Sequence, residues 1–361
     1  MQISENFYIN SQDKLSRVLE LIKSAKIFAL DTEFTRETTY YPILSIVQVA
    51  VKNNSGEKEL FIIDGLSDVD LSEFFDAIAN PNFTKILHSS LQDLQIFYQK
   101  SNKMPQGIVD TQVMANFCGL GFGLGYSSLV KSLFNEDLDK QQQRSNWQLR
   151  PLSDKQIDYA LFDVFFLEEI YLKFSKILQK NKCVNWFEEE MKIFLNKSLV
   201  RSDEALSKNF SFRGRSEEQI AKIKNLILWR ESWAQKINLP RQHFVRDNEL
   251  EKMVDGNFDC GRDLTAEMKK ELKKILNDSE VNKNFLTQRV KAWPMTKEQK
   301  DLFENGKSLI AKIARVRNFQ EQFLITSSDL KKLIYDANSF ENVVSGWRKE
   351  LFGKELKQLI S

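Results

Sequence analysis

Two acidic residues, Asp31 and Glu33, stand at the end of an apolar run. The run IFALDTEF (27–34) is typical of a buried β-strand. Because side chains alternate between the two faces of a strand, Asp31 and Glu33 are predicted to lie on the same side. Two like charges placed side by side repel each other, and a lone D-x-E pattern is not specific. The pair indicates a function only if other groups complete it.

Two further acids occur in segments with helical patterns. Asp93 lies one turn into SSLQDLQIF (89–97), a helix that opens with serines, and it could simply favour the helix N-terminus. Tyr159 and Asp163 are four residues apart and share one face of a later helix. Asp163 interrupts an apolar run, where a charge is costly to bury without a partner. A lysine is one such partner.

Together, the four acids point to one chemistry. Clustered carboxylates repel one another and become tolerable when divalent cations neutralise them. Hard cations such as Mg²⁺ prefer carboxylate oxygens as ligands. Two such ions about 4 Å apart stabilise an in-line phosphoryl displacement, one activating water and one supporting the leaving oxygen. The acids therefore predict a site with two divalent cations, with Mg²⁺ expected and Mn²⁺ left open.

The elements that must position these acids form an α/β pattern. Short links join the first strands, and helices separate the later ones, so we predict a mixed sheet with helices on its faces. A long helix opened by Ser153 is expected to carry the last acid. Strands are predicted at 26–31, 44–51, 60–64, 85–88 and 107–111, and helices at 11–25, 71–79, 89–100, from 112 onward and at 153–180.

The rear of the chain is predicted to be helical and repeated. The segments QHFVRDNELEKMV (242–254) and QFLITSSDLKKLI (322–334) have apolar residues at the same positions, at an offset of 80. Two copies are too few for a solenoid, so they indicate two small helical domains in tandem. We predict a catalytic domain at 1–200, a linker at 201–215 and helical domains at 216–294 and 295–361.

Composition limits the class of protein. The chain has 361 residues, 42% hydrophobic and 28% charged, which is ordinary for a globular protein. No apolar run reaches the length of a membrane span and no secretory signal is visible, so no membrane partner is expected. Three widely spaced cysteines suggest a reducing compartment, and we expect a cytoplasmic protein. Residues 1–210 carry a net charge of −5 and residues 211–361 one of +7, which suits a metal site followed by a domain that binds an anionic polymer. Ordinary drift of surface charge explains the difference equally well.

The motifs together resemble a known family. Asp31-x-Glu33, Asp93 within HSSLQDL (88–94) and Tyr159-x-x-x-Asp163 resemble the three motifs of DEDD exonucleases, in the branch that carries a tyrosine. Longer stretches are similar to bacterial ribonuclease D, and the rear units resemble HRDC domains. The stretches are DTEFTRETTYYP (31–42), LDKQQQRSNWQLRPL (138–152), LWRESW (228–233) and LPRQHFV (239–245).

This resemblance implies an RNase H-like catalytic domain followed by two HRDC-like domains. It implies removal of nucleotides from RNA 3′ ends by two-metal hydrolysis, with release of nucleoside 5′-monophosphates, and trimming of tRNA precursors by a monomeric enzyme. Asp31 would bridge both metals, Glu33 and Asp163 would complete the nucleophile-side metal, and Asp93 would hold the second. Tyr159 would orient the attacking water, since a tyrosine pKa near 10 is too high for the base itself.

Some residues near the motifs are candidates for holding the substrate. Phe34 and Tyr41 could stack on terminal bases, with core packing as the alternative. A basic and aromatic segment before the third motif could contact phosphates or serve as a structural hinge: Lys140, Arg144, Trp147 and Arg150. Structural roles are predicted for His88, for Asp110 as the cap of the next helix, and for Gln48 as a hydrogen-bonded buried amide, with contact to the substrate as the alternative for Gln48.

Two other functions compete with this one. A DNA exonuclease of the same superfamily would share the motifs and differ only in substrate preference. A catalytically dead RNA-binding scaffold would be favoured if a motif residue were substituted, and none of the five is.

Overall fold

The computed structural model of the chain describes residues 7–199, 206–207, 210, 212, 214–256, 263–277 and 295–360. The chain forms two compact units, each continuous in space but not in sequence. The first unit combines residues 1–34, 44–199 and 292–361, and the second combines residues 35–43 with 200–291. The chain therefore leaves the first unit twice, once in a short loop and once in a long helical segment.

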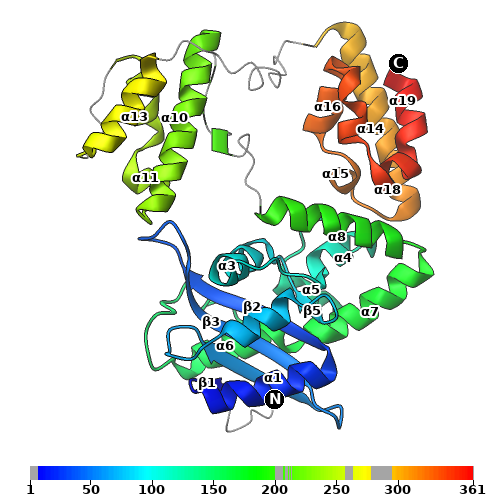
Figure 1. The fold of residues 1–361 in the computed structure, drawn as a ribbon. Helices are drawn as coiled ribbons and strands as arrows, with labels where there is room; N and C mark the ends of the chain where they lie inside the picture. Colours follow the sequence, from blue (N-terminus) through cyan, green and yellow to red (C-terminus); the bar gives the residue numbers. More distant parts are fainter. Residues whose placement is uncertain are drawn as a thin grey trace. The chain divides into compact units, whose positions relative to one another are not determined.

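A six-stranded mixed sheet forms the centre of the first unit, as predicted (Figure 1). Its strand order is β1-β4-β3-β2-β5-β6. β3 and β4 pair antiparallel, whereas β1 pairs parallel with β4 and β5 pairs parallel with both β2 and β6. The strands are β1 (Tyr8–Ile9), β2 (Ile27–Thr35), β3 (Ile43–Lys52), β4 (Lys58–Asp64), β5 (Thr84–Leu87) and β6 (Ile108–Asp110). Strand β1, with two residues, is too short to show a period and was not predicted.

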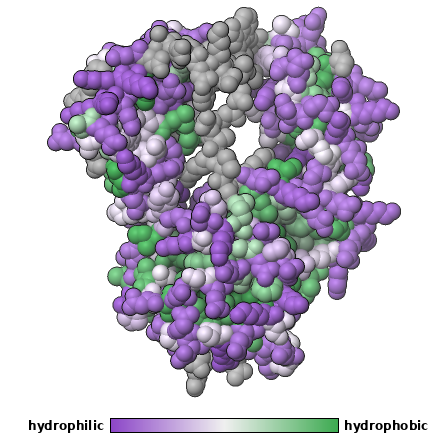
Figure 2. Space-filling view, viewed as in Figure 1, coloured by the Kyte–Doolittle hydropathy of each residue, from purple (hydrophilic) through white to green (hydrophobic). Residues whose placement is uncertain are grey.

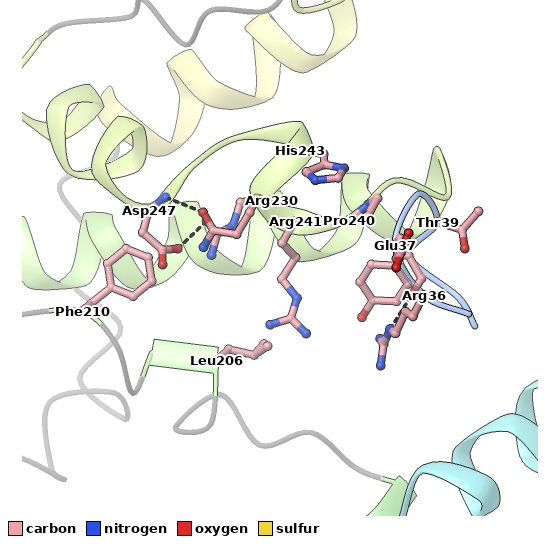
Figure 3. Close-up of a pocket in the computed structure, with 12 residues that line it drawn as sticks. Arg36, Glu37, Thr39, Leu206, Phe210, Arg230, Pro240, Arg241, His243 and Asp247 are labelled. Atoms are coloured by element: carbon pink, nitrogen blue, oxygen red, sulfur yellow. Dashed lines mark hydrogen bonds and ion pairs between the residues drawn. The ribbon is translucent and has the colours of Figure 1, made fainter. Parts of the chain in front are cut away.

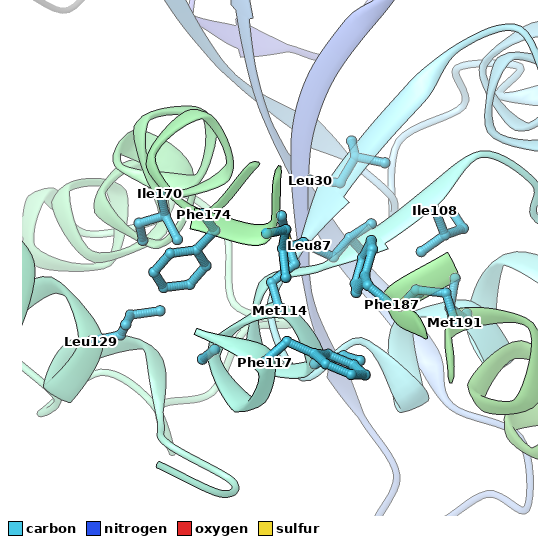
Figure 4. Packing of buried hydrophobic residues seen from close by; sticks show 14 of the residues in the cluster. Leu30, Leu87, Ile108, Met114, Phe117, Leu129, Ile170, Phe174, Phe187 and Met191 are labelled. Carbon is cyan, nitrogen blue, oxygen red and sulfur yellow. The ribbon is translucent and has the colours of Figure 1, made fainter. Parts of the chain in front are cut away.

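The two faces of the sheet carry separate cores because alternate residues of β3 point to opposite sides. Val47 and Val49 belong to the larger core, which Figure 4 shows from close by, and Ile46 and Ala50 belong to a smaller one. Helix α6 covers the smaller core. The helices of this part are α1 (Gln12–Ala25), α2 (Ser72–Ala79), α3 (Leu91–Ser101), α4 (Thr111–Phe117), α5 (Tyr126–Phe134), α6 (Asp154–Phe165), α7 (Leu167–Lys180) and α8 (Val184–Leu199).

The predicted single helix over 153–180 is wrong, because the structure has two helices, α6 and α7, that meet at Phe166. The Tyr126 hydroxyl explains the break. It donates to the Phe162 carbonyl at 3.0 Å and accepts from the Phe166 amide at 3.2 Å. These two backbone groups are four residues apart and would otherwise bond to each other in a continuous helix. The inserted hydroxyl thus ends α6 soon after Asp163.

The C-terminal helices pack into the larger core of the first unit. Trp347 stacks on Trp186 of α8 with centroids 5.7 Å apart and meets Phe117 of α4 at 5.2 Å. Arg348 pairs with Glu190 of α8 at 2.6 Å. These helices are α14 (Lys297–Arg317), α15 (Glu321–Leu324), α16 (Ser327–Tyr335), α17 (Phe340–Val343), α18 (Gly346–Arg348) and α19 (Lys354–Ile360). The compact units therefore divide the chain differently from the predicted domains.

The second unit has its own core, built on α10 (Glu217–Lys236), α11 (Arg241–Phe244), α12 (Asp247–Val254) and α13 (Ala266–Asn277). The loop 35–43 belongs to this unit, and its Tyr40 is buried there. The Tyr40 hydroxyl donates to Glu231 and accepts from Gln235 at 3.0 Å. The succession α10, α11, α12 recurs at an offset of 80 residues as α14, α15, α16, as the sequence repeat predicts.

Hydrophilic residues cover most of the face drawn in Figure 2. Among the described residues, no helix has both the length and the apolar composition that crossing a membrane requires.

We expect Trp347→Ala to destabilise the first unit by about 3–5 kcal/mol, since it removes a fully packed aromatic side chain and leaves a cavity. Trp347 is 1% exposed, and its Nε1 also donates to Glu190 at 2.8 Å. Urea unfolding followed by tryptophan fluorescence and circular dichroism measures the change. Val316→Ala is the control, because Val316 is 79% exposed. An equal effect of the two substitutions would contradict the shared core.

Candidate active site

Asp31 and Glu33 lie within β2 and not at its end, because the strand continues to Thr35. They share one side of the strand, as predicted from the alternation. Burial raises the pKa of Asp31 well above its ordinary value, and the nearby carboxylates of Asp93, Asp163 and Glu33 raise it further. Burial, Asp163 and Asp93 raise the pKa of Glu33 to about 9. The four acids, far apart in sequence, are therefore brought within electrostatic reach of one another.

Asp93 lies in the first turn of α3 and is buried. Burial raises its pKa to about 7, against the opposing effect of a hydrogen bond from Thr32. Thr32 stands between Asp31 and Glu33 and donates its hydroxyl to one Asp93 oxygen. Sequence reasoning missed Thr32, although its place between two acids was a signal. It ties β2 to α3.

Asp163 and Tyr159 face the same site from α6. Ser153 caps this helix and forms a reciprocal capping box with Gln156, as the predicted N-cap requires. Burial raises the pKa of Asp163 to about 7, and a hydrogen bond from Tyr159 opposes this shift. The pKa of Tyr159 is raised by burial and then by the charges of Asp163, Glu33 and Asp31. The tyrosine is therefore a hydrogen-bond donor at neutral pH.

Asp110 fixes the segment that leads into α3. Its carboxylate is fully buried and caps α4 through the amides of Gln112 and Val113, as predicted. It also accepts from the amides of Ser89 and Ser90, at 3.2 and 2.8 Å, and from the Ser90 hydroxyl at 2.9 Å. One carboxylate thus binds the start of two helices, and Asp93 follows three residues after Ser90. This second role was not predicted, since it joins residues 20 apart in sequence.

The side chains of His88 and Gln48 differ in whether their polar atoms have hydrogen-bond partners. His88 has a structural role, as predicted: its ring nitrogens lie 2.9 Å from the Thr111 hydroxyl and 3.0 Å from the Leu124 carbonyl. Gln48 is fully buried, but neither polar atom of its amide has a hydrogen-bond partner within the described structure. The prediction of a hydrogen-bonded amide is therefore wrong for Gln48.

Two of the predicted substrate-binding residues make structural contacts within the protein. Arg150 uses all five of its N–H groups: it donates to both Asp64 oxygens and to the carbonyls of Ser45, Trp147 and Leu149. Trp147 is 2% exposed and packs in the smaller core, 5.9 Å from the Tyr159 ring. In this geometry neither side chain is available to a phosphate or a base. Both agree with the structural alternative and support the segment before α6.

The remaining predicted substrate-binding residues lie in different settings. Lys140 and Arg144 are exposed, Phe34 is half-buried against the larger core, and Tyr41 is half-buried against the core of the second unit. The backbone amide of Tyr41 donates to Asn238 at 3.1 Å. Contact of these four residues with substrate stays a prediction.

The four acids have the right chemistry for divalent cations. Their oxygens are hard ligands. Burial raises the pKa of all four, and repulsion within the group, which bound cations would relieve, raises the pKa of Asp31 and Glu33 further. In the described part of the chain, no three His, Cys, Asp or Glu side chains are grouped closely enough to hold an ion in the conformation shown.

The chain is similar to known exonucleases. Residues 6–179 match a family model described as a 3′-5′ exonuclease. The ribonuclease D of Sphingobium indicum is 30% identical over 98% of this chain and 94% of its own length, and that of Bartonella henselae is 28% identical over 98% and 89%. The crystal structure of Escherichia coli RNase D, described as an exoribonuclease involved in structured RNA processing, matches with a TM-score of 0.76 and 26% identity, covering 100% of this chain and 99% of that one. The catalytic core of RRP6 from Trypanosoma brucei, 16% identical with a TM-score of 0.54, shares the fold.

The mixed sheet, its helices and the matched segment define an RNase H-like 3′-5′ exonuclease, in a superfamily that depends on divalent metal ions. Within it, the chain belongs to the ribonuclease D family. It is a hydrolase, a 3′-5′ exoribonuclease that acts on RNA.

Without divalent cations, we expect the stability of the protein to fall as the pH rises from about 5 to 9. The acids have folded-state pKa values of about 7 for Asp93 and Asp163 and about 9 for Glu33, above the unfolded values near 4. The folded state therefore holds more protons than the unfolded state in this range, and losing them as the pH rises costs stability.

Thermal melting in EDTA across this pH range measures the effect. In Asp163→Asn one of these groups cannot ionise, so the decline should be shallower, with a difference of at least about 1 kcal/mol at pH 8. Adding Mg²⁺ should raise the wild-type melting temperature at pH 8 more than that of the variant. Parallel curves for the two proteins would contradict the raised pKa of Asp163.

Proposed function

We propose that this enzyme removes nucleotides one at a time from RNA 3′ ends by hydrolysis with two divalent cations, Mg²⁺ or Mn²⁺, and releases nucleoside 5′-monophosphates. The observation that carries the proposal is the convergence of four acids from β2, α3 and α6 beside a hydroxyl donor, Tyr159. Such a group of acids is unfavourable by itself and is suited to neutralising cations.

We assign each acid to one or both of the cations. Asp31, at the centre of the charge group, would hold both ions. Glu33 and Asp163 would complete the site on the nucleophile side, and Asp93, oriented by Thr32, would hold the other ion. When bound, the two cations stabilise the charge that develops in an in-line displacement at phosphorus.

Tyr159 acts as a positioning donor. It stays protonated at neutral pH and bonds to Asp163, so its hydroxyl can orient the attacking water but is a poor base. Glu33 is the better proton acceptor among the neighbours of Tyr159, once bound cations lower its raised pKa.

The helical units supply the rest of the substrate contact. We propose that they are HRDC-like domains that hold folded RNA, and that tRNA precursors with single-stranded 3′ ends are the substrates. The enzyme would act as a monomer in the cytoplasm. The net charge of +7 over residues 211–361 supports an anionic partner for this part of the chain.

We expect Asp163→Asn to lower the rate of nucleotide removal by about 10³-fold, because it removes a charge needed to bind a catalytic cation. A time course on precursor tRNA labelled at the 3′ or 5′ end, with Mg²⁺, Mn²⁺ or EDTA, measures this rate. Asp158→Asn is the matched control, an exposed acid on the same helix. Shortening should begin at the 3′ end and stop in EDTA.

The same assay separates the two alternatives. Single-stranded DNA degraded as fast as RNA would favour a DNA exonuclease. Tight RNA binding without degradation, in every metal tested, would favour the scaffold.

Tyr159→Phe should lower kcat by roughly 10–100-fold, since loss of the hydroxyl removes the group that positions the attacking water. KM for RNA and the melting temperature should change little. Tyr171→Phe, on α7, is the control for removing a tyrosine hydroxyl. A Tyr159→Phe enzyme with full kcat would remove the tyrosine from the mechanism.

A further inference from the structure

The second unit contains a pocket of about 470 Å³ that the proposed mechanism does not use (Figure 3). Its walls come from the loop 35–43, from Leu206 and Phe210, from α10 and α11, and from the start of α12. All of these segments belong to the second unit. The volume falls within the range of small-ligand sites and is large enough for a nucleotide.

Arg230 is the buried group of this pocket. It is 2% exposed, and its Nη1 donates to the Val245 carbonyl at 2.9 Å and to Asp247 at 2.6 Å. Its Nε is buried without a hydrogen-bond partner in the described structure, and its Nη2 likewise has no recorded acceptor there. The Nε is enclosed by protein, and the guanidinium lies 5.7 Å from the Phe210 ring, so Nη2 is the unused donor of Arg230 that can face a ligand. An unpaired buried donor is costly, so the site favours an acceptor.

Arg241 adds a second guanidinium on the same wall. Its Nε pairs with Glu231 at 2.7 Å, and its side chain extends from α11 into the pocket (Figure 3). Within the described residues, its two Nη atoms have no recorded hydrogen bond, and neither does the His243 ring. The donors of two arginines and a histidine thus line one cavity.

These donors select the ligand chemistry. A fork of parallel N–H groups matches the oxygens of a carboxylate or a phosphate. Asp247 and Glu231 each neutralise part of one arginine charge, but they leave the unused N–H edges in place. Three lining arginines, with Arg36 the third, disfavour a cationic ligand. In an enzyme whose substrate is RNA, the available oxyanion is a phosphate.

We propose that this pocket binds a phosphate ester, through the Nη2 group of Arg230 and the Nη groups of Arg241. The inference rests on the proposed function for its choice of ligand, a phosphodiester of the RNA. Arg36, which lines the pocket, lies three residues after Glu33 in the chain. A strand of RNA held here would contact the loop that continues directly from the catalytic strand.

The test compares binding by full-length chains that carry Asp163→Asn to prevent degradation. The probes are a 5′-labelled single-stranded RNA of about 30 nucleotides, long enough to reach beyond a catalytic site, and adenosine 5′-monophosphate. The variants are Arg241→Gln, which removes a partly exposed arginine, and Arg230→Lys, which keeps the charge but removes the planar fork. Lys252→Gln, exposed on α12 outside the pocket, is the charge-matched control.

We expect Arg241→Gln to weaken RNA binding about tenfold at low salt and to reduce the slope of log K against log salt by about 0.7, the value for one lost phosphate contact on a single strand. Arg230→Lys should also weaken binding, and Lys252→Gln should do so by less than about twofold. Arg230 also holds α12 through Asp247, so weaker binding by Arg230→Lys is attributed to the pocket only if the melting temperature of the variant is unchanged.

The two probes distinguish a phosphodiester of RNA from the phosphate of a free nucleotide. Weaker RNA binding by Arg241→Gln supports a phosphodiester, and weaker binding of the monophosphate alone would assign the pocket to a free nucleotide. No change with either probe would overturn the proposal. Because binding is measured on inactive chains, this result is independent of the degradation assay, whose failure would instead remove the proposed function.

Discussion

The structure depends on holding four carboxylates, Asp93 buried and the other three half-buried, near one another against their own repulsion. Asp93, Asp163 and Glu33 each raise the pKa of Asp31, so the elements that carry these acids must be fixed from outside the group. Thr32 ties β2 to α3, Asp110 binds the start of α3 to α4, and Tyr126 ends α6 by entering its backbone ladder. These contacts use uncharged donors or a further acid, Asp110, whose charge itself raises the pKa of Asp93. They restrain the acids in position without neutralising the charge that the cations require.

The repeated helical unit is used in two different ways. The copy at the C-terminus joins the larger core of the catalytic domain through Trp347, Phe117 and Trp186, and Arg348 adds a charged contact to α8. The first copy keeps a separate core and takes in only the loop 35–43 from the catalytic part. One copy therefore braces the catalytic domain. The other remains a distinct unit with donors available for a ligand.

The arginines show how packing decides the role of a residue type. Arg150 lies in a basic segment near the catalytic helix, but its five N–H groups are all used by protein acceptors. Arg230 is more deeply buried than Arg150, yet one edge of its guanidinium has no acceptor in the described part of the chain. An arginine can bind a ligand when some of its N–H groups have no acceptor within the protein, and its positive charge in the sequence does not show this.

The sequence alone determined the elements that carry Asp31, Asp93 and Asp163, the mixed sheet and the helical repeat, because periodicity, caps and turn signals act over a few residues. Tertiary structure decided the rest. The helix break at Phe166 depends on a hydroxyl 40 residues away, and the burial of Trp147 depends on the core beneath α6. The docking of the last helices and the pocket of the second unit likewise join segments distant in sequence. Contacts of this kind depend on how faces pack together, which no local pattern records.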